Sequence, residues 1–224
     1  MARTIGILLF DGAEEMDFAG PWEVFTAAVS GMPSDRVITI AEQSRPITCE
    51  MGMRVIPDLP YGEAPEVDVI LVPGGSGARR EIANPATTNW LRNAAAKCTW
   101  LTSVCTGAFL LVGAGLASGR RITTHHDFIH DLRAAGGSDV VEGVRFVRDG
   151  NLVTAAGVMS GIEMSLWLVE RLYGRISRRR RGRILPTTIR RGVGSRGYSC
   201  ERRSQLSAFS AERHRRAGAE RLSP

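Results

Sequence analysis

Short apolar runs alternate with segments of helical periodicity along the first 174 residues. The apolar runs, several of them rich in branched side chains, predict buried strands at Thr4–Phe10, Val37–Ala41, Val67–Val72 and Trp100–Val104. The helical periodicity predicts helices at Glu15–Ala28, Asn84–Ala96, Thr106–Leu116 and Ser160–Tyr173.

Glycine and proline refine this pattern at three points. The Gly20-Pro21 pair predicts a break or a fresh start within the first helix, because proline lacks the N–H group that a helix needs. An Asp-Gly turn at 149–150 predicts a hairpin between Val140–Arg148 and Asn151–Ala156. Arg54–Pro57 is a candidate edge or excursion strand.

The alternation of strands and helices predicts an α/β domain with a doubly wound parallel sheet and helices on both faces. Functional sites in such sheets lie at the carboxyl ends of the strands. In this chain those ends are Phe10–Gly12, Pro73–Gly77 and Cys105–Gly107. We therefore expect the reactive residues at these three points.

Cys105 lies between an apolar strand and a helix rich in glycine, alanine and leucine. Strand, sharp turn, nucleophile and helix together form a nucleophile elbow, which exposes the reactive atom in a strained turn. The start of a helix also favours a thiolate, so we expect the pKa of Cys105 to be lowered. The alternative is a buried cysteine that packs as a small apolar side chain.

Two further segments could assist such a cysteine. The Pro-Gly-Gly-Ser-Gly run at 73–77 can bring backbone N–H groups against an anion, although it would also serve as a plain turn between strand and helix. Asp17 lies between Met16 and Phe18, and apolar neighbours tend to raise the pKa of a carboxyl group. A helix-capping or surface role for Asp17 is the alternative.

The remaining cysteine and histidine residues suggest no metal, disulfide or cofactor site. Cys49, Cys98, Cys105 and Cys200 show no paired spacing, which is typical of a reducing, cytoplasmic location. The His125-His126 pair, with Asp127 and His130 close by in the sequence, resembles a set of metal ligands, but no cysteine or carboxylate spacing completes such a site. The first apolar run is too short for a signal peptide or a membrane span, so we expect no membrane partner.

The basic residues are concentrated at the C-terminal end of the chain. Residues 1–174 hold 14 Lys and Arg against 20 Asp and Glu, whereas residues 175–224 hold 15 Arg against 3 Glu. A negative folded part repels phosphates, so any nucleic-acid binding would have to come from the basic segment. We expect one domain over 1–174 and a disordered tail over 175–224, which lacks a sustained apolar period.

Five strings in register resemble the DJ-1/PfpI superfamily. They cover nearly all of residues 4–174 and read DFAGPWEVF, VPGGSG, SVCTGAFLL, GRRITTHH and DGNLVTAAGVMSGIEMSLWLVERLYG. The resemblance implies a flavodoxin-like sandwich and a homodimer. It is greatest to two groups within the superfamily, the isonitrile hydratases and the ligand-sensing domains of AraC-type regulators, which share an aspartate in a D-x-x-G-P string and an S-x-C-T-G string.

The resemblance assigns roles to particular residues. Cys105 is implied as the nucleophile, Asp17 as the carboxylate beside it, and Thr106 as a source of a backbone N–H and a hydroxyl near the sulfur. Gly75, together with Gly74 and Ser76 of the same loop, is implied to bind the polar part of the substrate through backbone donors.

These roles predict an isonitrile hydratase that acts on a small molecule through a Cys105 thioimidate. One alternative is a ligand-sensing domain without catalysis. The sequence after Gly174 argues against this alternative, because it lacks the apolar periodicity of DNA-binding helix pairs. Another is a stress-type or glyoxalase-type relative, although those branches usually carry glutamate at the Asp17 position.

The segment after Gly174 departs from the family pattern, since relatives continue with mixed-charge sequence. One hypothesis is that residues 175–224 are translated out of frame, which sequencing of the coding DNA would test. A basic arm that binds nucleic acid or anionic surfaces is the functional alternative, and its affinity would fall steeply with salt.

Overall fold

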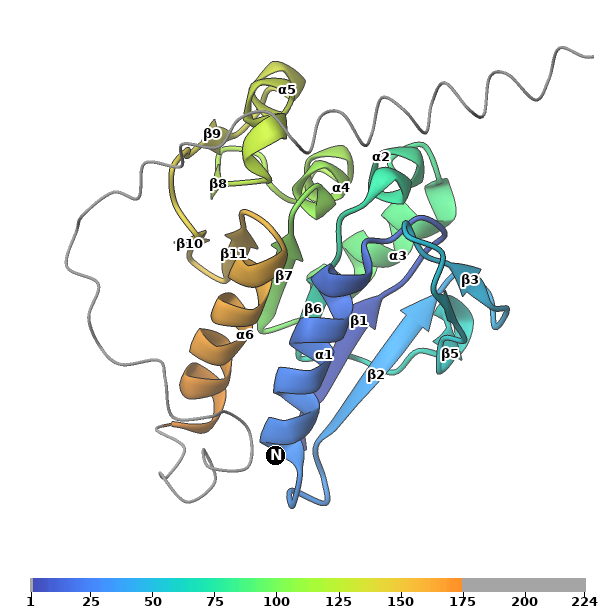
Figure 1. Ribbon diagram of the computed structural model, residues 1–224. Coiled ribbons are helices and arrows are strands. Elements are labelled where there is room, and N and C mark those ends of the chain that lie inside the picture. The colour runs from blue at the N-terminus through green and yellow to red at the C-terminus, as the bar shows by residue number, and fades with distance from the viewer. Residues whose placement is uncertain (1, 175–224) are drawn as a thin grey trace, which may run out of the picture. The chain divides into compact units, whose positions relative to one another are not determined.

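A seven-stranded sheet forms the centre of the computed structural model, which describes residues 2–174 (Figure 1). In their order across the sheet the strands are β10 (Phe146–Asp149), β11 (Leu152–Ala155), β7 (Trp100–Val104), β6 (Val69–Val72), β1 (Thr4–Leu8), β2 (Arg36–Ala41) and β5 (Leu59–Pro60). Neighbouring strands are parallel except β10 and β11, which form the predicted hairpin. The predicted fold class is confirmed.

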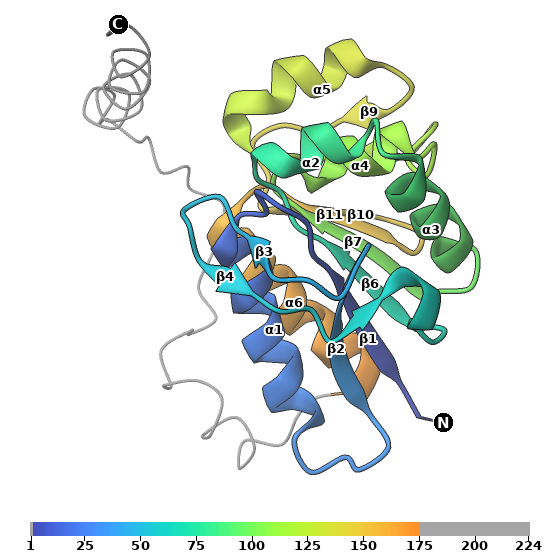
Figure 2. The ribbon, with the colours of Figure 1, turned by 90° about the vertical axis from the view of Figure 1, so that its right-hand side faces the viewer.

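Helices cover both faces of the sheet, as a doubly wound topology requires. Helices α1 (Glu15–Val29) and α6 (Val158–Tyr173) pack against each other on one face, and α2 (Ser76–Glu81), α3 (Pro85–Ala95) and α4 (Gly107–Gly113) lie on the other (Figure 2). All four residues of β6 are buried because both faces of this central strand are covered. The carboxyl ends of β7, β6 and β1, which are neighbours in the sheet, therefore meet at one edge.

Several smaller elements lie outside this sheet. Two short strand pairs stand apart from it, β3 (Ile47–Thr48) with β4 (Arg54–Val55) and β8 (Arg121–Ile122) with β9 (Asp139–Val140). Helix α5 (Ile129–Ala135) and the 3-10 helices Tyr61–Glu63 and His126–Phe128 complete the described part. None of the helices in that part is both long and apolar enough to cross a bilayer.

Two local predictions were wrong. Helix α1 continues through Gly20-Pro21 without a break, because proline removes only one backbone hydrogen bond and the Pro21 ring is buried in the packed face of the helix. Val140 belongs to β9 and not to the hairpin, whose first strand begins only at Phe146. The basic segment 175–224, with the predictions of a disordered or out-of-frame tail, lies outside the described residues, and so does Cys200.

Gly107, the first residue of α4, lets the helix approach the end of β6. A Cβ atom at this position would lie 2.4 Å from the carbonyl oxygen of Val72 and 2.7 Å from that of Pro73. Both contacts are with backbone atoms, which cannot rotate away as a side chain would. The turn that carries Cys105 therefore depends on a residue without a side chain.

We expect Gly107→Ala to destabilise the protein by about 1–3 kcal/mol, although alanine is the better helix former, because overpacking against backbone outweighs helix propensity. Gly62→Ala is the matched control, since a Cβ atom at Gly62 would meet open space. Urea unfolding followed by circular dichroism measures both variants. Equal stability of the two variants would contradict this account of the turn.

Candidate active site

Cys105 lies in a strained turn between β7 and α4. Its φ of 55° makes it the one residue other than glycine with a positive φ among residues 2–174. Such a conformation costs on the order of 1–3 kcal/mol and persists only where surrounding bonds hold it. The residue is partly exposed and lies between a strand and a helix, which is the predicted elbow geometry.

The Asp17 side chain is completely buried near the start of α1. Its Oδ2 atom accepts a hydrogen bond of 3.0 Å from the Gly74 N–H, which ties α1 to the loop after β6. Its Oδ1 atom has no hydrogen-bond partner within the described residues. A buried carboxylate oxygen without a partner is unusual in proteins, and at a candidate site it indicates a group that holds or transfers a proton.

Asp17 and Cys105 perturb each other electrostatically. Burial raises the pKa of Asp17 to about 7, while the Gly74 N–H and the Cys105 thiol counteract that rise. Burial and the Asp17 charge raise the pKa of Cys105 to about 12, against a lowering contribution from the Thr106 backbone. The sequence-based expectation of a lowered thiol pKa is therefore wrong, because desolvation outweighs the helix end.

The proton balance of the pair follows from these two directions. Near neutral pH the carboxyl group of Asp17 ionises more readily than the thiol of Cys105. The resting sulfur is then a thiol, and the neighbouring Asp17 carboxylate is the base that can remove its proton when a substrate arrives.

The glycine loop positions side chains and does not offer free donors. The Gly74 N–H is bound to Asp17, the Gly75 N–H donates to Thr106 Oγ1 at 2.9 Å, and the Ser76 N–H donates to Glu50 Oε2 at 2.9 Å. These N–H groups therefore have acceptors within the protein, and the substrate-binding role of Gly74, Gly75 and Ser76 stays a prediction.

Thr106 joins the loop to the cysteine turn. Its hydroxyl donates to the Gly75 carbonyl at 3.0 Å and accepts the Gly75 N–H, while its backbone lowers the pKa of Cys105 by hydrogen bonding. A Cβ atom on Gly74 would lie 2.6 Å from the Thr106 nitrogen, so this approach requires glycine. The structure thus brings together Cys105, Thr106, Asp17 and Gly74.

Two residues that the sequence-based predictions did not name, Thr124 and Glu14, also belong to this neighbourhood. Thr124, which is fully buried, donates its hydroxyl to the Cys105 carbonyl at 2.8 Å. Glu14 adds a negative charge that raises the pKa of both Asp17 and Cys105. A Cβ atom on Gly157 would lie 3.2 Å from the ring of His125, so the start of α6 adjoins that histidine. Thr124 and His125 both lie in the GRRITTHH string, but the string does not indicate the bond that Thr124 makes to the Cys105 carbonyl.

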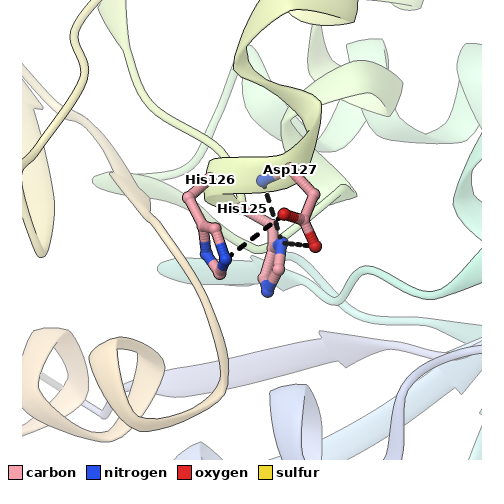
Figure 3. A group of neighbouring side chains, drawn as sticks. All are labelled: His125, His126 and Asp127. Carbon is pink, nitrogen blue, oxygen red and sulfur yellow. Dashed lines mark hydrogen bonds and ion pairs between the residues drawn. The ribbon is translucent and has the colours of Figure 1, made fainter. Parts of the chain in front are cut away.

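His125, His126 and Asp127 form the cluster in the described part whose atoms could hold a metal ion, with ligand atoms within 4.8 Å of one another (Figure 3). Asp127 Oδ2 lies 3.7 Å from His125 Nδ1, and Asp127 Oδ1 lies 3.3 Å from His126 Nε2. However, His125 Nδ1 accepts the Asp127 N–H and thereby caps the following 3-10 helix. Capping explains this arrangement without a metal ion.

A separate hollow lies at the carboxyl ends of β1 and β2, and neither Cys105 nor Asp17 lines it. Its charged groups are mutually satisfied: Asp11 is paired with Arg45 at 2.6 Å, and Glu81 accepts from Thr87 and Asn84. Unlike Asp17, these carboxylates have partners. The candidate active site is therefore the cluster around Cys105.

The raised pKa of Asp17 makes stability depend on pH. Between about pH 4 and pH 7 the folded state binds more protons at this group than the unfolded state, so its contribution to stability falls as pH rises. We expect the unfolding free energy of Asp17→Asn minus that of the wild type to increase across this window, by on the order of 4 kcal/mol.

Urea titrations at a series of pH values measure this difference. The exposed Asp131→Asn on α5 is the control and should follow the wild type. If the difference between Asp17→Asn and the wild type stays constant from pH 4 to pH 7, the pKa of Asp17 is not raised in the folded state.

Comparisons with known proteins identify relatives of this chain. The isonitrile hydratase of Pseudomonas putida is 37% identical over 174 residues, which cover 78% of this chain and 74% of that protein. The HTH-type transcriptional regulator GbdR of Pseudomonas aeruginosa is 29% identical over 77% of this chain and 47% of its own length.

The fold also matches the crystal structure of a ThiJ/PfpI family protein from Pseudomonas syringae. The TM-score is 0.70 at 28% sequence identity, over 77% of this chain and 69% of that one. The family model for the DJ-1/PfpI family matches residues 3–171. The chain belongs to the DJ-1/PfpI family.

Proposed function

We propose that this protein is a hydratase that converts an isocyanide to an N-substituted formamide through a covalent intermediate on Cys105. The observation that carries the proposal is the pairing of a strained cysteine with a fully buried aspartate that has one unpartnered oxygen. The isonitrile hydratase relative supports the same chemistry.

The first half of the reaction forms a thioimidate. The Asp17 carboxylate accepts the thiol proton while the Cys105 sulfur bonds to the terminal carbon of the isocyanide. Protonated Asp17 then returns that proton to the same carbon, which gives an R–N=CH–S linkage and a regenerated carboxylate. Because the pKa of the Cys105 thiol, about 12, lies above that of Asp17, about 7, the proton leaves the sulfur only as the sulfur–carbon bond forms.

The second half of the reaction consumes water. Asp17 accepts a proton from a water molecule as the water oxygen bonds to the thioimidate carbon, and protonated Asp17 then gives that proton to the nitrogen. The carbon–sulfur bond breaks as the new hydroxyl group becomes a carbonyl and its proton passes to the sulfur, which leaves the N-substituted formamide. The sum is one isocyanide plus one water, with Cys105 and Asp17 restored.

A ligand-sensing domain is the second candidate, supported by the regulator relative. Such a domain would bind a small molecule at the same edge of the sheet without turning it over. The two candidates differ in product formation, so one assay for the formamide product separates them.

The homodimer implied by the family resemblance stays a prediction that sedimentation analysis would test.

Replacement of the nucleophile should abolish catalysis. We expect Cys105→Ala to lower kcat for a simple alkyl or aryl isocyanide by at least about 10³-fold, as loss of a covalent nucleophile does elsewhere. Cys98→Ala is the matched control, because Cys98 is a buried free thiol whose sulfur donates a hydrogen bond to the Ala95 carbonyl. The formamide product is quantified by mass spectrometry. A separate assay with methylglyoxal tests the glyoxalase-type alternative. An unchanged rate in Cys105→Ala would sink the proposal.

The pH dependence should report the aspartate. Because ionised Asp17 is the base, kcat/KM should rise with pH through an apparent pKa of about 7 and level off above it. Asp17→Asn should lose this rise and about 10²–10⁴-fold in rate. Steady-state kinetics from pH 5 to pH 9 provide the profile, and a variant with the wild-type profile would exclude Asp17 as the base.

A further inference from the structure

The backbone around Cys105 is held by two bonds to buried neighbours. Its N–H donates to the Ala155 carbonyl of β11 at 3.0 Å, and its carbonyl accepts the Thr124 hydroxyl at 2.8 Å. The first bond extends the pairing of β7 with β11 by one residue. The second comes from a loop and fixes the carbonyl side of a residue whose φ is 55°.

Thr124 is itself held firmly. It has no exposed surface, and the preceding residue, Thr123, donates its N–H to the Thr154 hydroxyl of β11 at 2.7 Å. The strand that binds the Cys105 N–H therefore also anchors the loop that binds the Cys105 carbonyl. Bulk water does not reach Thr124, so a solvent molecule cannot replace its hydroxyl as the donor to the Cys105 carbonyl.

The Cys105 carbonyl and the Thr106 N–H belong to one planar peptide unit. The carbonyl end of this unit is bound to Thr124, and hydrogen bonding from the Thr106 backbone lowers the pKa of the Cys105 thiol. Because the unit is planar, a bond that fixes the carbonyl also fixes the direction of the N–H. A donor at the carbonyl also polarises the amide and strengthens its N–H as a donor.

We propose that Thr124 is a positioning residue for the nucleophile: its hydroxyl fixes the Cys105–Thr106 peptide so that the Thr106 N–H points at the sulfur. Thr124 does not touch the reacting atoms and acts through this peptide alone. The inference rests on Cys105 as the nucleophile of the proposed function, but not on the identity of the substrate.

Thr124→Val removes the hydroxyl at nearly constant volume, and Thr124→Ser keeps it. Thr102→Val is the matched control. Thr102 is equally buried, lies on β7, which leads into the Cys105 turn, and donates its hydroxyl to the Ile70 carbonyl at 2.8 Å. It therefore loses the same kind of bond without altering the Cys105–Thr106 peptide.

The measurement is the rate at which iodoacetamide alkylates Cys105, followed by mass spectrometry of the peptide that contains it, from pH 6 to pH 10. We expect Thr124→Val to be alkylated about tenfold more slowly near neutral pH, with its rate profile displaced to higher pH. Thr124→Ser should restore the wild-type rate, and Thr102→Val should retain it.

Equal rates in Thr124→Val and Thr102→Val would overturn the inference, since both variants would then report only a lost buried bond. If Thr124→Val shows no cooperative unfolding, Thr124→Ala compared with Thr124→Ser repeats the test with smaller side chains. A wild-type protein that is alkylated at Cys105 but produces no formamide would contradict the proposed function and leave this test intact.

Discussion

The carboxyl group of Asp17 has no exposed surface, and only one of its oxygen atoms has a hydrogen-bond partner in the described chain. This burial connects the other features of the site. It raises the pKa of the carboxyl group, and the charge of Asp17 in turn helps to keep the Cys105 sulfur in its thiol form. The pair therefore holds one mobile proton, which is what addition of a thiol and then of water to a carbon atom requires.

The fold supplies this arrangement by bringing three strand ends together. Asp17 follows β1, the glycine loop follows β6 and Cys105 follows β7, and these strands are neighbours in the sheet. Close approach of the backbones, which Gly74 and Gly107 permit, brings the segments within hydrogen-bonding distance. The reactive geometry thus depends on residues without side chains as much as on those with chemical groups.

Much of this arrangement could be predicted from the sequence. The apolar runs indicated the main strands, and the place of Cys105 between an apolar strand and a helix rich in glycine, alanine and leucine indicated the strained turn. Two things could not be predicted. The ionisation of Cys105 depends on how deeply distant segments bury it, and the partners of the loop N–H groups depend on side chains such as Glu50 that are remote in sequence. Thr124 was missed for the same reason, because its bond to the Cys105 carbonyl joins two separate segments.

The central claim is that Asp17 exchanges its proton near neutral pH. The most direct measurement is a ¹³C NMR titration of the aspartate carboxyl carbons in labelled protein, with the Asp17→Asn variant used to assign the Asp17 signal. The account predicts a midpoint of about pH 7 for that signal. A midpoint close to pH 4, as for an aspartate in water, would contradict it.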